Sequence, residues 1–388
     1  MSTDPRHGMG ERVATARRAR GLTQQGLAAA AELSYATIRA VERGARLPSD
    51  DSLAAIAAAL AIDPSRLLAS GARVTGRVHA AVPAIAAYDV PDDGPVRPLD
   101  QLRAAVAEAE GWRLAAQYVR IAETMPPLLE ELARAHTAAD GQDPAVAALL
   151  VSAYRSADAV AYKFGARDLS GRLVELMRWA SKGADDDLLT SGVAYVRTEV
   201  FFAARAHDPG LRALEAALDA GPPVTDARSA AARGALHMRA AVIAGRAGRT
   251  DRADEHLAEA RAMADRAPEG VYSGTAFGPD SVRIHELSHA VSLGDAGVPQ
   301  ALAIARKWAP PREMPPERRS GFSIELARAQ VWGGHRRDAF ESLRVARRIA
   351  PQHTREHRWA RESAATLLRL GRADDPELVG FAEWIGAV

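Results

Sequence analysis

The 388-residue sequence contains no cysteine. A disulfide framework, a thiolate metal site and a cysteine nucleophile are therefore excluded. Aromatic residues make up only 5% of the chain, whereas alanine dominates long stretches, as is typical of closely packed helices. The sequence also has no apolar signal core at its start and no run of about 18 apolar residues that could span a membrane. We therefore expect a soluble, cytoplasmic and mostly helical protein without membrane association.

An excess of charge of one sign is also absent, because 50 Lys and Arg residues face 49 Asp and Glu residues. This balance argues against a protein that coats nucleic acid through excess positive charge. Only three basic residues are lysine, and nine arginines lie among the first 70 residues, beside seven acidic residues.

A chain of this length exceeds a single domain of roughly 100–200 residues, so we expect at least two folding units.

Residues 8–70 predict five short helices. An amphipathic segment over residues 11–20 ends at Gly21, and Thr23 offers an N-cap hydroxyl for a second helix. Ser34 can cap a third helix over residues 35–43, in which Ile38 and Val41 share the core-facing side. A fourth helix should begin at residues 48–49 and a fifth at residues 63–65.

The motifs of this segment, in their order and spacing, carry a resemblance to a known family. They are Leu22-Thr23-Gln24, Leu27-Ala28, Thr37-Ile38, Val41-Glu42-Arg43-Gly44 and Pro48-Ser49. The segment resembles XRE-type (lambda-repressor-like) helix-turn-helix domains, whose third helix lies in the DNA major groove. The alternative is a set of five helices that serves only protein contacts.

The resemblance implies which residues contact a double-stranded DNA operator. They are Thr23, Gln24, Ser34, Tyr35, Ala36, Thr37, Arg39, Ala40, Arg43 and Arg46. Gln24 would bond a phosphate and steady the third helix, and Tyr35 and Arg39 would supply polar base readout. The two alanines would contact thymine methyl groups, and the last two arginines would contact phosphates.

The rest of the chain divides into a linker and a helical array. Residues 71–98 are Gly- and Pro-containing, which predicts an interdomain linker, although residues 79–88 could pack as a short helix. Over residues 99–388 helical patterns alternate with turns, and Ala-Arg pairs recur at Ala260, Ala305 and Ala346, at spacings of 45 and 41 residues. We expect a degenerate tetratricopeptide-like α-solenoid, so that the whole chain is all-α. Helices are expected at Gly111–Arg134, Pro144–Phe164, Leu169–Ser181, Leu188–His207 and Pro209–Ala220.

The combination of the two parts is similar to a group of actinobacterial regulators that join an XRE-type domain to such an array. The likeness is carried by residues 97–100, 277–279, 291–295 and 315–319. A more distant parallel is with peptide-pheromone receptors of the same two-part build. The resemblance implies control of transcription.

His285-Glu286-Leu287-Ser288-His289 is an HExxH sequence, which on a helix can present two zinc ligands and a general base. Ser292 stands where the extended form of this motif has a glycine. A repeat helix also lacks the sheet and cleft of a protease, so we favour packing or groove-facing histidines over a zinc-dependent hydrolase. A non-catalytic metal or ligand contact is the intermediate alternative. We predict no enzyme activity, no metal and no cofactor.

The sequence thus predicts a homodimeric transcriptional regulator whose array mediates dimerisation and senses a peptide or small-molecule effector. Candidate effector contacts are residues of aromatic and charged character on first helices of the array, while Phe201 and Phe202 are assigned to the core. These candidates are Tyr154, Tyr195, Arg197, Glu199, His237, Arg239 and His285. The alternative functions are a protein-interaction scaffold and the hydrolase at His285, Glu286 and His289.

Overall fold

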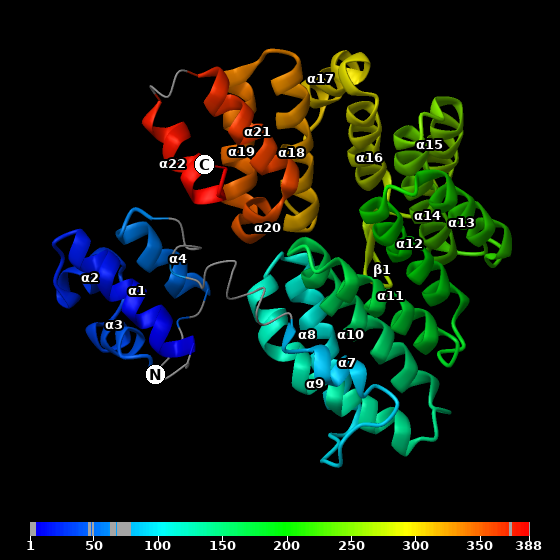
Figure 1. The fold of residues 1–388 in the computed structure, drawn as a ribbon, viewed down its shortest axis with the longest axis horizontal. Helices are drawn as coiled ribbons and strands as arrows, with labels where there is room; N and C mark the ends of the chain where they lie inside the picture. Colours follow the sequence, from blue (N-terminus) through cyan, green and yellow to red (C-terminus); the bar gives the residue numbers. More distant parts are fainter. Residues whose placement is uncertain are drawn as a thin grey trace. The chain divides into compact units, whose positions relative to one another are not determined.

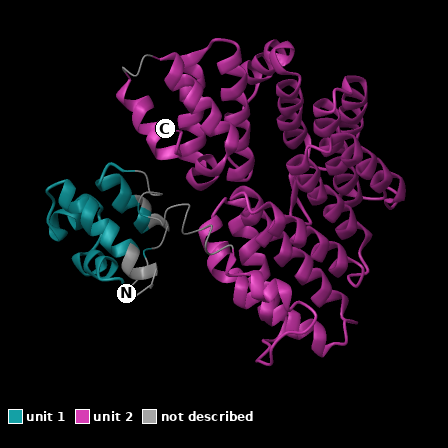
Figure 2. Cartoon of the chain, viewed as in Figure 1, with its two compact units in different colours: residues 1–77 teal, residues 78–388 magenta. Residues whose placement is uncertain are grey.

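The computed structural model describes residues 5–45, 48, 50–62, 67, 79–371 and 375–387. The chain forms two compact units, residues 1–77 and residues 78–388 (Figure 2). Nearly all regular structure in the described residues is α-helical, which confirms the all-α prediction (Figure 1). No helix among these residues is both long and apolar enough to cross a membrane.

The first unit contains the helices α1 (Pro5–Ala19), α2 (Gln24–Ala30), α3 (Tyr35–Glu42) and α4 (Asp50–Ala59). Their starts agree with the predicted caps at Thr23 and Ser34, and Gly21 and Gly44 have φ values of 66° and 69°. The predicted fifth helix over residues 63–70 lies outside the described residues apart from Leu67, and Arg46 lies outside them as well.

One apolar core holds the first unit together. Val13 from α1, Leu27 from α2 and Ile38 and Val41 from α3 are at most 1% exposed. They pack with α4 residues such as Ile56. Burying large aliphatic side chains contributes about 1.5–3 kcal/mol each, so this core fixes the orientation of α3 within the unit.

The second unit begins with α7 (Val82–Ala86), which packs on α9. Residues 79–98 therefore belong to this unit, although the sequence placed them in the linker. The other helices are α8 (Leu99–Leu114), α9 (Tyr118–Ala138), α10 (Pro144–Lys163), α11 (Arg167–Ser181), α12 (Asp187–Ala204), α13 (His207–Ala220), α14 (Ala227–Arg246), α15 (Thr250–Ala264), α16 (Pro279–Ser292), α17 (Val298–Lys307), α18 (Pro316–Trp332), α19 (Arg336–Ile349), α20 (Pro351–Glu356), α21 (Arg358–Leu370) and α22 (Pro376–Ile385), with a 3₁₀ turn at Gly294–Gly297.

Consecutive helices pack in pairs, most extensively α10 with α11, α14 with α15 and α18 with α19. Gly248, Gly294 and Gly334 lie in the turns that precede α15, α17 and α19, and their φ values are 73°, 66° and 77°. A left-handed backbone of this kind favours glycine. The assignment of these pairs to the tetratricopeptide class stays a prediction.

Two further details of the second unit differ from the sequence prediction. The helix expected over Gly111–Arg134 is wrong, because α8 ends at Leu114 and α9 starts at Tyr118, with Ala116 at φ 58° between them. No glycine or proline marks this break, so the sequence carried no stop signal there. The second difference is an antiparallel hairpin of β1 (Gly270–Tyr272) and β2 (Thr275–Phe277), which the helical pattern did not predict.

Candidate functional site

The outer face of α3 carries the predicted base-reading residues. Tyr35 is 44% exposed, Ala36 and Arg39 are exposed, and Ala40 is half-buried. Ile38 and Val41 occupy the opposite, buried side of the same helix. The hydrophobic spacing therefore presents a short face of mixed aromatic, methyl and guanidinium character to solvent.

Hydroxyl caps fix the starts of α2 and α3. Thr23 Oγ1 accepts a hydrogen bond from Gly26 N at 2.9 Å, so the cap forms even without the usual acidic partner. Ser34 Oγ accepts from Thr37 N at 3.1 Å and lies 2.8 Å from Thr37 Oγ1. Thr23 and Ser34 are exposed at the helix ends, whereas Thr37 is half-buried.

Glu42, at the end of α3, connects all three helices of the motif. Arg17 of α1 donates to its two carboxylate oxygens at 2.6 and 3.1 Å, and Gln24 Nε2 donates to Oε2 at 2.7 Å. Gln24 is thus bonded to the third helix, and its second amide hydrogen is the one available for a phosphate. Arg43 is exposed, and its Nε donates to Arg39 O at 3.2 Å.

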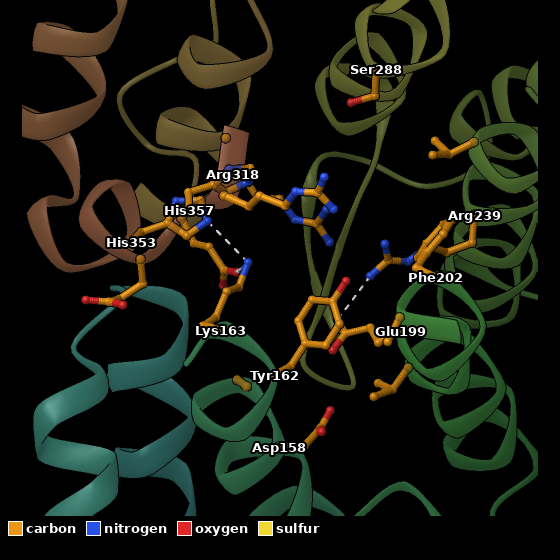
Figure 3. A pocket seen from close by; sticks show the side chains of 18 of the residues that line it. Asp158, Tyr162, Lys163, Glu199, Phe202, Arg239, Ser288, Arg318, His353 and His357 are labelled. Atoms are coloured by element: carbon orange, nitrogen blue, oxygen red, sulfur yellow. Dashed lines mark hydrogen bonds and ion pairs between the residues drawn. The ribbon is translucent and has the colours of Figure 1, made fainter. Parts of the chain in front are cut away.

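The second unit holds a cavity of about 640 Å³ (Figure 3). Its walls come from α8, α10, α12, α14, the hairpin, α16, α18, α20 and α21. Ligand pockets have volumes of roughly 300–1,000 Å³, so the cavity is large enough for a small molecule or a short peptide. The walls join residues from 113 to 361, which explains why no local motif marks the cavity in the sequence.

The charge of the cavity is positive. Ten of its lining residues are Lys or Arg, and five are Asp or Glu. Burial and the neighbouring Glu199 raise the pKa of Asp158 well above its usual range, and burial raises the pKa of Glu325 to about 7. Burial thus favours the neutral form of both carboxyl groups, which increases the positive excess.

One end of the cavity contains a buried network around Lys163 of α10 (Figure 3). Lys163 Nζ lies 2.9 Å from Glu317 Oε1 and donates to His353 Nε2 at 3.2 Å. Because an ammonium group is only a donor, the His353 proton resides on Nδ1, which lies 2.6 Å from Ser320 Oγ. Burial and Lys163 lower the pKa of His353 to about 3, so the imidazole is neutral.

Tyr195 of α12 lines the cavity, and its pKa reflects the positive charge there. Arg318 donates to its hydroxyl at 2.9 Å, and the guanidinium carbon of Arg239 lies 4.3 Å from its ring centroid. Burial by itself raises the pKa of this phenol, yet Arg239 and Arg318 outweigh burial and lower the pKa to about 8. The balance indicates strong cationic character at this position.

Four of the seven predicted effector residues line the cavity, namely Tyr195, Glu199, Arg239 and His285. The remaining three have other partners. Tyr154 is 1% exposed in the core, Arg197 lies 5.2 Å from the Phe201 ring centroid, and His237 Nδ1 lies 3.0 Å from His256 Nδ1. The sequence predicts on which helix a residue lies, but it does not predict whether the side chain points into the cavity.

Arg246, a cavity residue on α14, has aromatic contacts that were not predicted from the sequence. Its guanidinium carbon lies 4.3 Å from the Phe202 ring centroid and 5.0 Å from that of Trp359. Phe202 is half-buried and lines the cavity, so its assignment to the core was wrong. A usable signal was present, since Arg239 and Arg246 are seven residues, about two helical turns, apart on one helix.

The HExxH residues of α16 have three different sets of partners. His285 faces the cavity and its Nδ1 lies 2.9 Å from Ser281 O, whereas His289 Nε2 lies 3.4 Å from Asp254 of α15. Glu286 accepts a hydrogen bond from Arg261 Nε at 2.6 Å. Within the described part of the chain, no group of three or more His, Cys, Asp or Glu residues is placed to hold a metal ion.

Comparison with known proteins identifies the first unit. Residues 13–67 match the family model described as helix-turn-helix. The N-terminal unit is therefore a helix-turn-helix domain of the DNA-binding type predicted from its motifs. No curated protein sequence matches the chain.

Solved structures give only loose overall likenesses. PlcR of Bacillus thuringiensis, in complex with the peptide PapR7 and DNA, is 14% identical, with 67% of this chain and 95% of that chain covered and a TM-score of 0.29. Apo ComR of Streptococcus vestibularis is 12% identical, with coverages of 89% and 92% and a TM-score of 0.27. A mutant of PrgX is 7% identical, with coverages of 97% and 99% and a TM-score of 0.29.

Proposed function

We propose that the protein is a cytoplasmic transcriptional regulator that reads a DNA operator through α3 and binds an effector in its helical unit. The observation that carries the proposal is the exposed face of α3, formed by Tyr35, Ala36 and Arg39, in a domain that matches the helix-turn-helix family. Arg39 can donate two hydrogen bonds to guanine, and the methyl group of alanine fits thymine.

Operator binding as a homodimer is part of the same proposal. A single domain of this size makes too few base contacts for tight and specific binding, and dimers of such domains read half-sites one helical turn apart. The helical array would supply the dimer interface. A peptide or small molecule in the cavity would favour one arrangement of the two DNA-binding domains over another.

The test is selection of bound fragments from random double-stranded DNA with the purified full-length protein. We expect an enriched palindromic site and about 10- to 100-fold weaker binding of that site after Arg39→Ala, since one bidentate base contact contributes about 1–3 kcal/mol. Arg18→Ala on α1 is the matched control, because its side chain is exposed and its hydrogen bond among the described residues is to its own helix, at Ala14 O. The control should retain wild-type affinity.

Two outcomes would overturn the proposal. The absence of any enriched fragment would favour the protein-scaffold alternative, which a pull-down of a stable protein complex would then support. Equal losses of affinity in Arg39→Ala and Arg18→Ala would show that general charge, rather than the α3 face, binds the DNA. Sedimentation of the protein with the selected fragment would distinguish a dimeric from a monomeric complex.

A further inference from the structure

Three arginines of the cavity have neutral partners. Arg155 donates to Ser273 O at 2.7 Å and to Thr275 Oγ1 at 2.6 Å, and Arg318 donates to the Tyr195 hydroxyl. Arg246 lies between two aromatic rings. Among the described residues, none of the three forms an ion pair with a carboxylate, and Glu317 and Glu325 act on Arg318 and Arg246 only from beyond ion-pair distance.

These three charges lower the stability of the folded protein, because all three side chains are at least half-buried. A guanidinium group removed from water without a counter-ion is destabilising, and a buried charge is normally compensated by an opposite charge. Three carboxylates of the wall are not available to these arginines, because Glu317, Glu199 and Glu356 already pair with Lys163, Arg239 and Arg361. The wall of the cavity therefore holds more positive than negative charge.

Aromatic rings lie beside Arg239 and Arg246. The guanidinium carbons of Arg239 and Arg246 lie 5.7 and 4.3 Å from the same Phe202 ring centroid, and that of Arg239 also lies 4.3 Å from the Tyr195 ring centroid. A guanidinium held flat against an aromatic ring keeps its edge available for two parallel hydrogen bonds to a carboxylate or phosphate. Arg318 approaches the edge of the same Tyr195 residue through the hydroxyl.

We propose that this cavity binds a ligand with at least two oxyanionic groups, carboxylate or phosphate, which Arg246 and Arg318 recognise. Arg239 assists from the shared Phe202 and Tyr195 rings, and the exposed edges of Phe202 and Trp359 contact the apolar part of the ligand. The inference deepens the proposed function, because this ligand would be the effector of the regulator. Neutral polar molecules of the same size would not compensate the charge and would not bind.

The experiment uses full-length protein with citrate and inorganic pyrophosphate as the two oxyanion sources. Glucose serves as an uncharged polar probe, and sodium chloride matches the ionic strength. Calorimetry measures the affinity, and ultraviolet titration of the tyrosinate band measures the pKa of Tyr195, with Tyr195→Phe used to assign the signal. We expect at least one anion to bind and to raise that pKa from about 8 toward its ordinary value, because the anion neutralises Arg239 and Arg318.

Arg246→Gln and Arg318→Gln should each weaken binding of that anion about 10- to 100-fold, as expected for the loss of a charge-assisted hydrogen-bond pair. The matched control is Arg228→Gln, at an exposed position in the first turn of α14 outside the cavity. Arg246→Lys keeps the charge but not the planar fork and should give an intermediate affinity. Unchanged helical content and a melting temperature no lower than that of the wild type would verify that each variant is folded.

The anion-binding experiment and the operator selection can fail independently, so the two proposals are tested separately. If neither anion binds above the sodium chloride control at millimolar concentration, or if Arg228→Gln weakens binding as much as Arg246→Gln, the oxyanion site is overturned. A protein that still selects an operator then keeps the proposed function. If an anion binds with the expected variant pattern but no operator is selected, the site stands and the regulator proposal fails. Binding of pyrophosphate alone would identify phosphate as the source, and binding of citrate alone would identify carboxylate.

Discussion

Arg17 Nε donates to Glu42 Oε1 over 2.6 Å and thereby joins the first helix of the helix-turn-helix domain to the end of its third. The two side chains are only 13% and 5% exposed, so the pair is well shielded from water. Because Gln24 donates to the same carboxylate, one side chain positions both α1 and α2 against the helix that carries the base-reading face.

We expect Glu42→Ala to destabilise the N-terminal unit by about 3 kcal/mol, because it leaves the shielded Arg17 charge without its partner. The free energy of opening can be measured by hydrogen exchange of the α3 amides in the full-length protein. The double variant Arg17→Met with Glu42→Gln removes both charges and should recover part of the loss. A single-variant effect below about 0.5 kcal/mol, the range of an exposed pair, would contradict this role.

Gly234→Ala should destabilise the second unit by about 1–3 kcal/mol, as overpacking of a close-packed site does. A methyl group at this position of α14 would meet the ring of Phe277, the last residue of β2, and Cβ of Met263. Urea denaturation of the full-length protein measures the change.

The matched control for Gly234→Ala is Gly171→Ala on α11, where nothing lies within 4 Å of the added methyl. Gly171→Ala should stabilise the unit by about 0.5–1 kcal/mol through helix propensity alone. Similar behaviour of the two variants would show that Phe277 does not press against α14.

The buried histidines make the stability of the second unit depend on pH. His353 has a folded pKa of about 3, lowered by burial and by Lys163, against an ordinary value near 6.5. Its contribution to stability is therefore complete above pH 6.5 and is lost as the pH falls toward 3, because the unfolded chain then binds the proton more readily.

From this, the free energy of unfolding should fall by about 1 kcal/mol per buried histidine between pH 7 and pH 5.5. His353→Gln should reduce that decrease by about 1 kcal/mol, whereas His335→Gln, at an exposed position, should leave it unchanged. Urea denaturation at the two pH values provides the comparison. Identical pH dependence in wild type and His353→Gln would mean that His353 is not neutral in the folded protein.

The HExxH segment should not bind zinc at stoichiometric level. His285 and His289 lie beside different partners, Ser281 O and Asp254, and Glu286 is held by Arg261. Equilibrium dialysis should give well below one zinc ion per chain, with no change on Glu286→Gln. One tightly bound zinc per chain that is lost after His289→Gln would reverse this conclusion.

The sequence predicted those parts of the fold that depend on neighbouring residues. Thr23 and Ser34 each precede an amphipathic helix, and their hydroxyl groups cap α2 and α3 as local chemistry requires. The break at Ala116 was missed because alanine carries no turn signal, although tertiary packing holds it at φ 58°. The hairpin was missed because two three-residue strands are too short for a periodic pattern.

The cavity could be predicted only in part, because its residues come together through packing of distant helices. Lys163, Glu317 and His353 form one network although up to 190 positions separate them in the sequence. Tyr195 and Arg239 were selected for their residue types on the correct helices, and both line the cavity. By the same reasoning Tyr154 was selected, but one position along α10 separates the buried Tyr154 from the cavity-facing Arg155.

The position of Arg246 between Phe202 and Trp359 also has a mechanical consequence. Phe202 lies on α12, before the hairpin, and Trp359 lies on α21, after it, so one guanidinium group bridges two segments of the helical array. Attraction between a cation and a ring acts within about 6 Å of the ring centroid, so small shifts of either ring keep the contact with Arg246. An anion bound to Arg246 would restrain these shifts and make the connection between α12 and α21 more rigid. The response to a ligand would then spread along the array as reduced motion, even without a change of mean shape.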